Sequence, residues 1–308
     1  MKPALKEASL VLGPEPVAAA PAESTGLWPD LMELTKARLT TLVLVTTFVG
    51  FCLGSPDGLA WLPLFHCLAG TALVAGGAAA FNQLIERVPD ARMRRTRERP
   101  LPAGRMTPRF AFGFGLALSV AGLVWLALGT HLLAASLAFA TWVVYVVAYT
   151  PLKRLSSSCI LVGAVSGAIP PVIGYAAAGG TLDATAAFLF GVLFLWQMPH
   201  FLAVNWLYRE EYETAGFCMW SNGDLDGRRS ALISVGFAMA LLVLTVGFAP
   251  QGLFASAYFP VATVLVGVWL VAAIRWTFRR DRSSARAVFL LSILYLPLVL
   301  GLMVFARA

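Results

Sequence analysis

Nine apolar segments follow one another along this chain of 308 residues, and polar stretches separate them. A helix needs about 20 apolar residues to cross the hydrocarbon core of a bilayer, whereas a strand of a membrane barrel needs only about 10. Because most of the segments have the helical length, the sequence predicts an all-α integral membrane protein with nine transmembrane helices. The predicted spans are residues 39–54, 60–82, 110–128, 131–149, 158–178, 184–206, 230–249, 254–274 and 286–306.

Basic residues are confined almost entirely to alternate loops. Of the 23 Lys and Arg residues, all but Arg307 precede the first segment or lie between later segments on the same predicted side. Cytoplasmic loops of membrane proteins are rich in Lys and Arg, so this pattern predicts a cytoplasmic N-terminus, an external C-terminus and an odd number of spans. These loops account for the net charge of +7, and we therefore expect a lipid bilayer and no nucleic acid as partner.

The first 26 residues are rich in Pro, Ala and Glu and contain no sustained apolar run. This composition predicts a disordered cytoplasmic tail over residues 1–30, followed by one membrane domain over residues 31–308. The tail has neither the apolar core of a signal peptide nor the Arg-rich composition of a transit peptide. We therefore expect a multi-pass protein of the bacterial cell (inner) membrane, with the mitochondrial inner membrane as the less favoured alternative.

The first polar block lies at the predicted cytoplasmic end of the second segment. Asn82, Glu86 and Asp90 are spaced four residues apart, which places them along one face of a helix. Such a line of oxygen ligands suits Mg²⁺, which takes one or two carboxylates and completes its shell with water and substrate phosphates. The basic residues that follow can bind diphosphate oxygens, or can simply set topology: Arg94, Arg95 and Arg99.

A second block follows the fourth segment. Lys153 and Arg154 stand at its predicted cytoplasmic end, where they can either complete an anion site or set topology. Pro170 and Pro171 lie inside the next segment and are expected to break its helix, which is tolerated where a helix is buried in protein or lines a cavity.

A third block lies in and after the sixth segment. His200 can be a haem axial ligand, a proton acceptor or a hydrogen-bonded packing residue. Glu210 and Glu211 can hold a second Mg²⁺, or can pair with Arg209 in a solvated loop. The residues alone leave these alternatives open.

Together the blocks resemble the UbiA-type intramembrane prenyltransferases, and within that family the members that farnesylate haem. The similarity covers roughly residues 30–305. The matching residues are Glu33-x2-Lys36-x-Arg38, Asn82-x3-Glu86-x3-Asp90-x2-Met93-x-Arg95-Thr96-x2-Arg99-Pro100-Leu101-Pro102, Tyr149-Thr150-x-Leu152-Lys153-Arg154, Gly167-Ala168-x-Pro170-Pro171-x2-Gly174, Trp196-Gln197-x-Pro199-His200-Phe201 and Arg209-Glu210-Glu211-Tyr212.

The resemblance implies a nine-helix bundle around a central cavity that opens to the cytoplasmic side. It implies Mg²⁺-dependent transfer of farnesyl from farnesyl diphosphate to the vinyl group of haem B, which gives haem O for haem-copper oxidases and releases diphosphate. A haem A synthase or a terminal-oxidase assembly is then an expected partner. Carried over onto this chain, the resemblance implies a catalytic set of Asn82, Glu86, Asp90, Lys153 and Arg154. The implied metal ligands are Asn82, Glu86 and Asp90, with Glu210 and Glu211 for a second ion. The implied diphosphate-binding residues are Arg94, Arg95, Arg99 and Arg209, and His200 is expected to contact haem.

The chain departs from the family pattern at two places. Ala37 stands where proline is usual. Where the superfamily has its second Asp-x3-Asp pair, this chain has residues 209–212 (REEY), which leaves the first block as the surer ligand set.

Three other functions stay open at this point. A UbiA-type enzyme with an aromatic acid or quinone precursor as acceptor is disfavoured by the block at residues 196–201 (WQMPHF). A transporter usually has internal repeats and a mid-membrane site, and neither is evident in this sequence. A non-catalytic oxidase-assembly protein does not need the acidic and basic residues of the first block.

Overall fold

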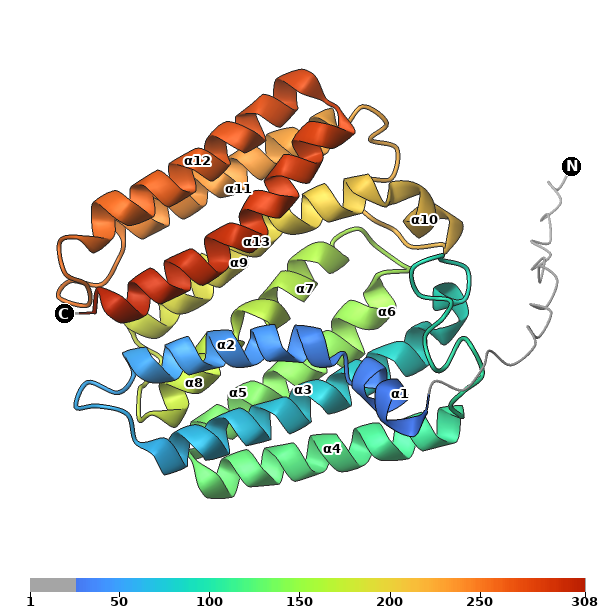
Figure 1. Ribbon diagram of the computed structural model, residues 1–308, viewed down its shortest axis with the longest axis horizontal. Coiled ribbons are helices and arrows are strands. Elements are labelled where there is room, and N and C mark those ends of the chain that lie inside the picture. Colours follow the sequence, from blue (N-terminus) through green and yellow to red (C-terminus); the bar gives the residue numbers. More distant parts are fainter. Residues whose placement is uncertain (1–25, 308) are drawn as a thin grey trace, which may run out of the picture.

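The computed structural model describes residues 26–307, which form a bundle of helices that run back and forth between two ends (Figure 1). Among these residues, eight helices are long and apolar enough to cross a membrane, and counting a bent helix pair as one span brings the number to nine. The predictions of an all-α membrane fold and of nine spans are thereby confirmed. The predicted tail falls mainly on residues 1–25, outside the described residues, but its last four residues already belong to the first helix.

Each predicted span corresponds to one helix or to a run of consecutive helices. The first span is α1 and α2, which meet at an angle of 49°. The helix of the fifth span is interrupted at Ile169, directly before Pro170-Pro171, as expected, and α7 and α8 on either side together still form one candidate span of 19 residues. The elements are α1 Leu27–Leu34, α2 Ala37–Leu53, α3 Trp61–Asp90, α4 Pro108–Gly129, α5 Leu132–Val143, the π-helix η1 Val144–Tyr149, α6 Thr150–Leu152, α7 Cys159–Ala168, α8 Pro170–Ala177, α9 Ala184–Leu207, α10 Arg209–Thr214, α11 Arg228–Gly247, α12 Tyr258–Arg279 and α13 Arg282–Phe305.

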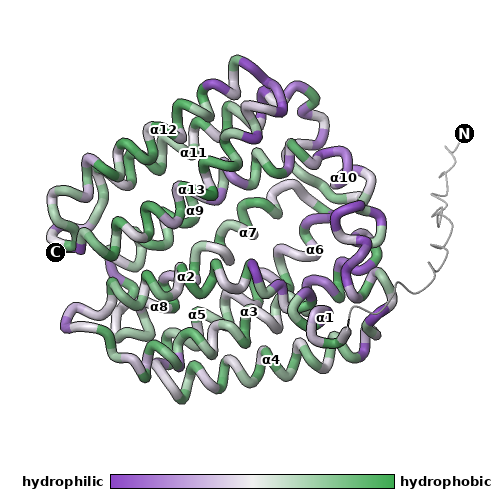
Figure 2. Tube along the Cα trace, in the orientation of Figure 1, coloured by the Kyte–Doolittle hydropathy of each residue, from purple (hydrophilic) through white to green (hydrophobic). Residues whose placement is uncertain are grey.

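Hydrophilic residues gather at one end of the bundle, toward the right and the top in Figure 2. We call it the basic end and define it by the connections 91–107, 153–158, 208–227 and 280–281. At the opposite end, Arg307 donates hydrogen bonds to the carbonyls of Cys52, Ser55 and Pro56. The last carbonyls of a helix have no partner within it. The basic residue outside the charge pattern therefore has a structural role, which is to cap α2.

Glycines allow α2 and α8 to cross with their backbones in contact. A methyl group on Gly50 would overlap the carbonyl of Pro171, and a methyl group on Gly174 would overlap the carbonyl of Thr47. Small residues at a crossing let two membrane helices approach closely. This contact fixes α2, whose first residue follows Lys36, against the rest of the bundle.

Candidate active site

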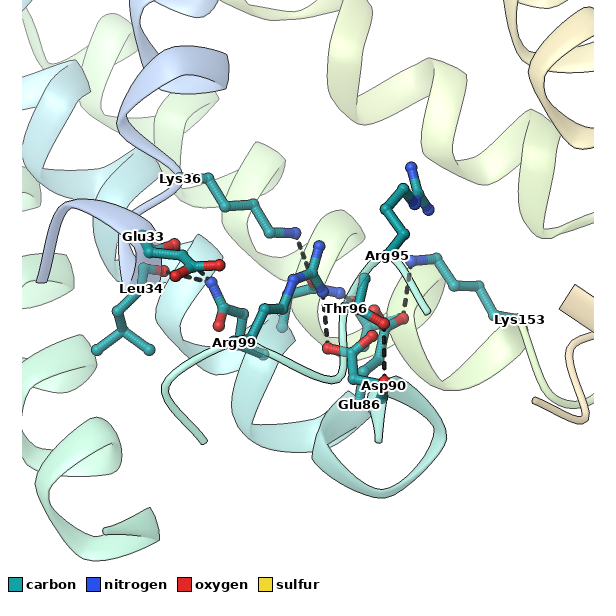
Figure 3. Close-up of polar contacts among 12 residues, drawn as sticks. Glu33, Leu34, Lys36, Glu86, Asp90, Arg95, Thr96, Arg99 and Lys153 are labelled. Carbon is teal, nitrogen blue, oxygen red and sulfur yellow. Dashed lines mark hydrogen bonds and ion pairs between the residues drawn. The ribbon is translucent and has the colours of Figure 1, made fainter. Parts of the chain in front are cut away.

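The three predicted Mg²⁺ ligands lie on successive turns of α3 at the basic end. Asn82, Glu86 and Asp90 are 0%, 5% and 1% exposed, so the helical spacing becomes a line of buried oxygen atoms. Helix α3 continues through Pro89, and Asp90 is its last residue. Figure 3 shows Glu86 and Asp90 close together, with basic side chains reaching toward them from other elements.

Each of the three ligands contacts a different cation. The pairs are Lys36 Nζ with Asn82 Oδ1 at 2.5 Å, Lys153 Nζ with Glu86 Oε1 at 2.7 Å, and Arg99 with Asp90 Oδ2 at 2.7 Å. We call these six residues the paired cluster. Its cations come from the α1–α2 break, from the loop after α3 and from the loop after α6, so three separate parts of the chain converge on one face of α3.

One carboxylate oxygen of Asp90 has no partner among the described residues. Its Oδ1 is buried and accepts no hydrogen bond from the described residues, and such an atom is costly to bury unless something binds it. Residues 26–307 contain no group of three or more His, Cys, Asp or Glu side chains that could hold a metal ion. An ion at this place therefore depends on amide, water or phosphate oxygens as well, which fits Mg²⁺.

The loop after α3 turns back toward its own helix. Thr96 Oγ1 donates to the carbonyl of Asp90 at 2.8 Å, and this turn returns Arg99 to the Asp90 carboxylate. Arg99 is predicted to bind diphosphate, and the structure places its guanidinium beside the predicted metal ligands.

Lys36 is a residue of the cluster to which the sequence assigned no site role. It lies between α1 and α2 with φ of +49°, a left-handed conformation that is uncommon for a residue other than glycine. Gln83 of α3 donates to the carbonyls of Glu33 and Leu34, which ties the end of α1 to α3. The available signal was the place of Lys36 in the block Glu33-x2-Lys36-x-Arg38, which matches the family just before the first predicted span.

The π-helix η1 contributes two tyrosines that contact the lysines of the paired cluster. Tyr145 OH accepts a hydrogen bond from Lys36 Nζ at 3.3 Å, and the ring of Tyr149 lies 4.5 Å from Lys153 Nζ. Asn82 Nδ2 donates to Thr150 Oγ1 at 3.0 Å, which fixes the amide so that its oxygen faces Lys36. π-Helical turns occur frequently at functional sites.

Lys153 is a cation in this setting. Burial alone would lower the pKa of its ammonium group, but Glu86 and the hydroxyls of Tyr149 and Tyr145 together raise that pKa well above its ordinary value. Lys153 therefore keeps its charge at neutral pH.

Other residues predicted to bind diphosphate form no hydrogen bond or ion pair with the paired cluster within residues 26–307. Arg95 donates to Tyr212 OH at 3.2 Å, and its guanidinium lies over the ring of Tyr208. The side chains of Arg94 and Arg154 are exposed and form no hydrogen bond or ion pair with the rest of the described chain. Their roles stay predictions.

The acidic pair after α9 does not approach the paired cluster through any hydrogen bond or ion pair within residues 26–307. Glu210 is 80% exposed and lies 3.4 Å from Arg209, which also donates to the carbonyl of Trp206 at 3.2 Å. This ion pair agrees with the alternative in which the acidic residues pair with Arg209 at the solvated surface. Binding of a second Mg²⁺ by Glu210 and Glu211, and of diphosphate by Arg209, stay predictions.

His200 is a residue of α9, and its side chain contacts α13. Its Nδ1 is 2.7 Å from Ser292 Oγ, and its ring stacks on Trp196, whose Nε1 donates to the carbonyl of Ser292. Ser292 Oγ also lies 2.5 Å from the carbonyl of Phe289, which can only accept. A serine hydroxyl has a single proton, so His200 Nδ1–H is the donor to Ser292, and the neutral imidazole carries its lone pair on Nε2.

Known proteins match this chain over most of its length. The sequence model of the UbiA prenyltransferase family matches residues 43–296. Protoheme IX farnesyltransferase of Solibacter usitatus (strain Ellin6076) is 42% identical over 288 residues, which cover 90% of this chain and 98% of the relative. The human mitochondrial protoheme IX farnesyltransferase is 38% identical over 274 residues, which cover 89% of this chain and 61% of the relative.

Solved structures share the fold. A digeranylgeranylglyceryl phosphate synthase superposes with a TM-score of 0.77 at 15% identity, covering 91% of this chain and 98% of that one. A UbiA homolog from Archaeoglobus fulgidus bound to DMAPP and Mg²⁺ superposes with a TM-score of 0.65 at 14% identity, covering 89% and 99%. At these identities the likeness shows the arrangement of the helices.

Proposed function

The chain belongs to the UbiA prenyltransferase family, and from this premise we propose that it transfers farnesyl from farnesyl diphosphate to a vinyl group of haem B, giving haem O and diphosphate. Relatives with the name protoheme IX farnesyltransferase cover about nine-tenths of the chain. The observation that carries the proposal is the paired cluster. It combines buried oxygen ligands with cations at one place, as a site for a metal-bound diphosphate requires.

Asn82, Glu86 and Asp90 would hold Mg²⁺ in this proposal, and Asp90 Oδ1 is already without a partner among the described residues. The bound ion supplies positive charge that stabilises the leaving diphosphate. Lys36, Lys153 and Arg99 then bind phosphate oxygens in place of their present partners. The cations thus neutralise the carboxylates before the substrate arrives and the diphosphate afterwards.

The bond changes need no redox partner. The bond between farnesyl C1 and the diphosphate oxygen breaks, and its electron pair leaves with the diphosphate. The π electrons of the haem vinyl group form the new carbon–carbon bond to farnesyl C1. Water adds to the resulting cation beside the porphyrin ring and releases a proton. Fixed cations at the developing diphosphate charge provide the electrostatic stabilisation that usually dominates such catalysis, and the apolar bundle shields the farnesyl cation from premature hydrolysis.

His200 would face haem with Nε2, as an axial ligand of the iron. A metal-binding histidine is usually fixed through a hydrogen bond from its other ring nitrogen, and Ser292 accepts that bond here. The positive-inside pattern supports a basic end that faces the cytoplasm, where a soluble diphosphate is released. An associated haem A synthase or terminal-oxidase assembly stays a prediction.

The test is pigment analysis of membranes that contain the protein and are incubated with haem B, farnesyl diphosphate and Mg²⁺. We expect haem O from the wild type, at least a hundredfold less from Glu86→Gln, and unchanged haem O from Glu98→Gln, which alters an exposed carboxylate in the loop after α3. Haem O from all three proteins would keep the reaction and remove Glu86 from the site. No haem O from the folded wild type would overturn the proposed reaction.

A further inference from the structure

A pocket of about 340 Å³ lies at the basic end, between the end of α9 and the beginning of α13. We propose that it binds the two propionate carboxylates of the haem substrate, an inference that rests on the function proposed above. The pocket is lined by Leu207, Tyr208, Arg282, Ser283 and Arg286.

The pocket presents two guanidinium groups that no carboxylate neutralises. Arg282 donates to the carbonyl of Leu207 at 3.1 Å, and neither Arg282 nor Arg286 belongs to any ion pair between residues 26 and 307. The adjacent carboxylate, Asp281, accepts from Ser284 N at 2.7 Å and from its hydroxyl at 2.5 Å. It therefore caps α13 instead of pairing with the arginines.

A pair of carboxylates suits this arrangement. Arginine binds a carboxylate through two parallel hydrogen bonds, so two arginines match the two propionates of one tetrapyrrole. The first turn of α13 adds the partial positive charge of a helix N-terminus. Tyr208 contributes a hydroxyl that is free to donate to a carboxylate oxygen, since it forms no hydrogen bond with the described part of the chain.

The pocket and His200 lie along the same two helices. On α9, Leu207 follows His200 by seven residues, or ~10 Å along the axis. On α13, Arg286 precedes Ser292 by six residues, or ~9 Å. The hydrogen bond between His200 and Ser292 marks where the two helices meet. A flat ligand along this seam with its centre at His200 thus extends its carboxylates toward the pocket.

An apolar ring occupies the interval between the pocket and His200. Phe289 lies one helical turn beyond Arg286, and its ring centroid is 5.2 Å from that of His200. This order of groups, from two cations through an aromatic ring to an imidazole, matches the propionate edge, the porphyrin face and the iron of haem.

The two anionic substrates then have separate cations. The diphosphate is assigned to Lys36, Lys153 and Arg99, whereas the propionates are assigned to Arg282 and Arg286 on another helix. Haem would therefore be anchored by groups that do not compete with the leaving diphosphate.

The experiment measures the affinity of the full-length protein in phosphatidylcholine vesicles for haem B and for its dimethyl ester, in which both propionates are uncharged. We expect Arg286→Gln and Arg282→Gln each to raise the Kd for haem B about tenfold, with little change for the ester. Arg279→Gln changes an exposed arginine of the same end, outside the pocket, and serves as the matched control. The KM for farnesyl diphosphate should stay unchanged in all three variants, which also shows that they are folded.

The outcomes separate this inference from the proposed function. If the wild type makes haem O but Arg286→Gln loses affinity for haem B and for the dimethyl ester equally, the propionate site is overturned and the proposed reaction is kept. An effect of the substitutions that is present only after phosphatidylglycerol is added to the vesicles would instead assign the pocket to a lipid headgroup. Absence of haem O from the wild type would remove the function itself.

Discussion

Lys153 Nζ lies 2.7 Å from Glu86 Oε1, and these side chains are only 13% and 6% exposed. The ammonium group also lies 4.5 Å from the centre of the Tyr149 ring and 5.8 Å from that of Phe217. Each of these two buried charges is stabilised by the other, because removal of one side chain leaves the opposite charge buried without a partner.

Substitution of one member of this pair should destabilise the protein. We expect Lys153→Gln to lower the free energy of unfolding by about 3 kcal/mol, the range found when one partner of a buried ion pair is removed. The double variant Lys153→Gln/Glu86→Gln should lose less than the sum of the single variants. Denaturant unfolding in detergent micelles measures all three.

The exposed pair Arg97–Glu98 is the matched control, since its side chains are 59% and 68% exposed. Its removal should change stability by less than about 1 kcal/mol. Strictly additive losses at Lys153 and Glu86 would show that the two side chains do not interact in the folded protein.

Asp90→Asn should raise the Mg²⁺ concentration needed for half-maximal activity by about tenfold or more. The substitution removes one of two carboxylates from the proposed ion, while the amide can still accept from Arg99. Initial rates over a series of Mg²⁺ concentrations test this, and chelation of Mg²⁺ should stop the wild-type reaction. An unchanged Mg²⁺ dependence in Asp90→Asn would exclude this carboxylate as a ligand.

Ser292→Ala should weaken haem binding without removing His200. The variant loses the acceptor for His200 Nδ1–H, so the proton can move to Nε2 and the lone pair is no longer fixed toward haem. We expect the KM for haem to rise about tenfold, with the KM for farnesyl diphosphate unchanged, and the absorption spectrum of bound ferric haem to lose its histidine-ligated form. Ser292→Thr keeps the hydroxyl and should restore both; a wild-type spectrum in Ser292→Ala would argue against a positioning role.

The sequence predicted features that depend on one helix alone. The span lengths follow from the thickness of the bilayer, and the alignment of Asn82, Glu86 and Asp90 follows from 3.6 residues per turn. Span length and alignment along one helix each depend only on neighbouring residues in the sequence, and both predictions agree with the structure.

Contacts between distant helices could not be predicted in the same way. Lys36 and Asn82 are 46 residues apart, and His200 and Ser292 are 92 apart, so each contact depends on which helices pack together. Arg154 illustrates the converse, because it adjoins Lys153 in the sequence but points to the exposed side. Adjacent residues on a turn face different directions, and spacing alone does not choose between them.

Asp183 should make stability depend on pH only under acidic conditions. It caps α9 by accepting from Thr185 N and Ala186 N, and its carboxylate also accepts from Tyr175 OH. Burial alone would raise the pKa of Asp183, but these hydrogen bonds together lower it below its ordinary value. A depressed pKa stabilises the folded protein above the unfolded value of about 3.9, and this contribution is lost as the pH falls through the folded pKa.

We therefore expect Asp183→Ala to be less stable than the wild type by about 1 kcal/mol at pH 7 and at pH 5. The difference should shrink only below about pH 4, where the wild-type carboxylate becomes protonated. Thermal unfolding across this pH range measures the difference, with Asp57→Asn as a control at the same end of the bundle. A difference that already declines between pH 7 and pH 5 would contradict the lowered pKa.

Gly174→Ala should destabilise the bundle and disturb the active site together. The added methyl group would overlap the carbonyl of Thr47, and because that atom is backbone, α2 must move as a unit. Overpacking of this kind costs about 1–3 kcal/mol or more. Since Lys36 directly precedes α2, its ammonium group should shift from Asn82, and the KM for farnesyl diphosphate should rise.

Gly236→Ala is the matched control, because nothing lies within 4 Å of the added methyl group in α11. Alanine favours a helix over glycine by about 1 kcal/mol, so this variant should be as stable as the wild type or slightly more stable. Thermal unfolding and the two KM values distinguish the variants. If Gly174→Ala lowered stability but left the KM for farnesyl diphosphate unchanged, the crossing of α2 and α8 would stabilise the fold without positioning Lys36.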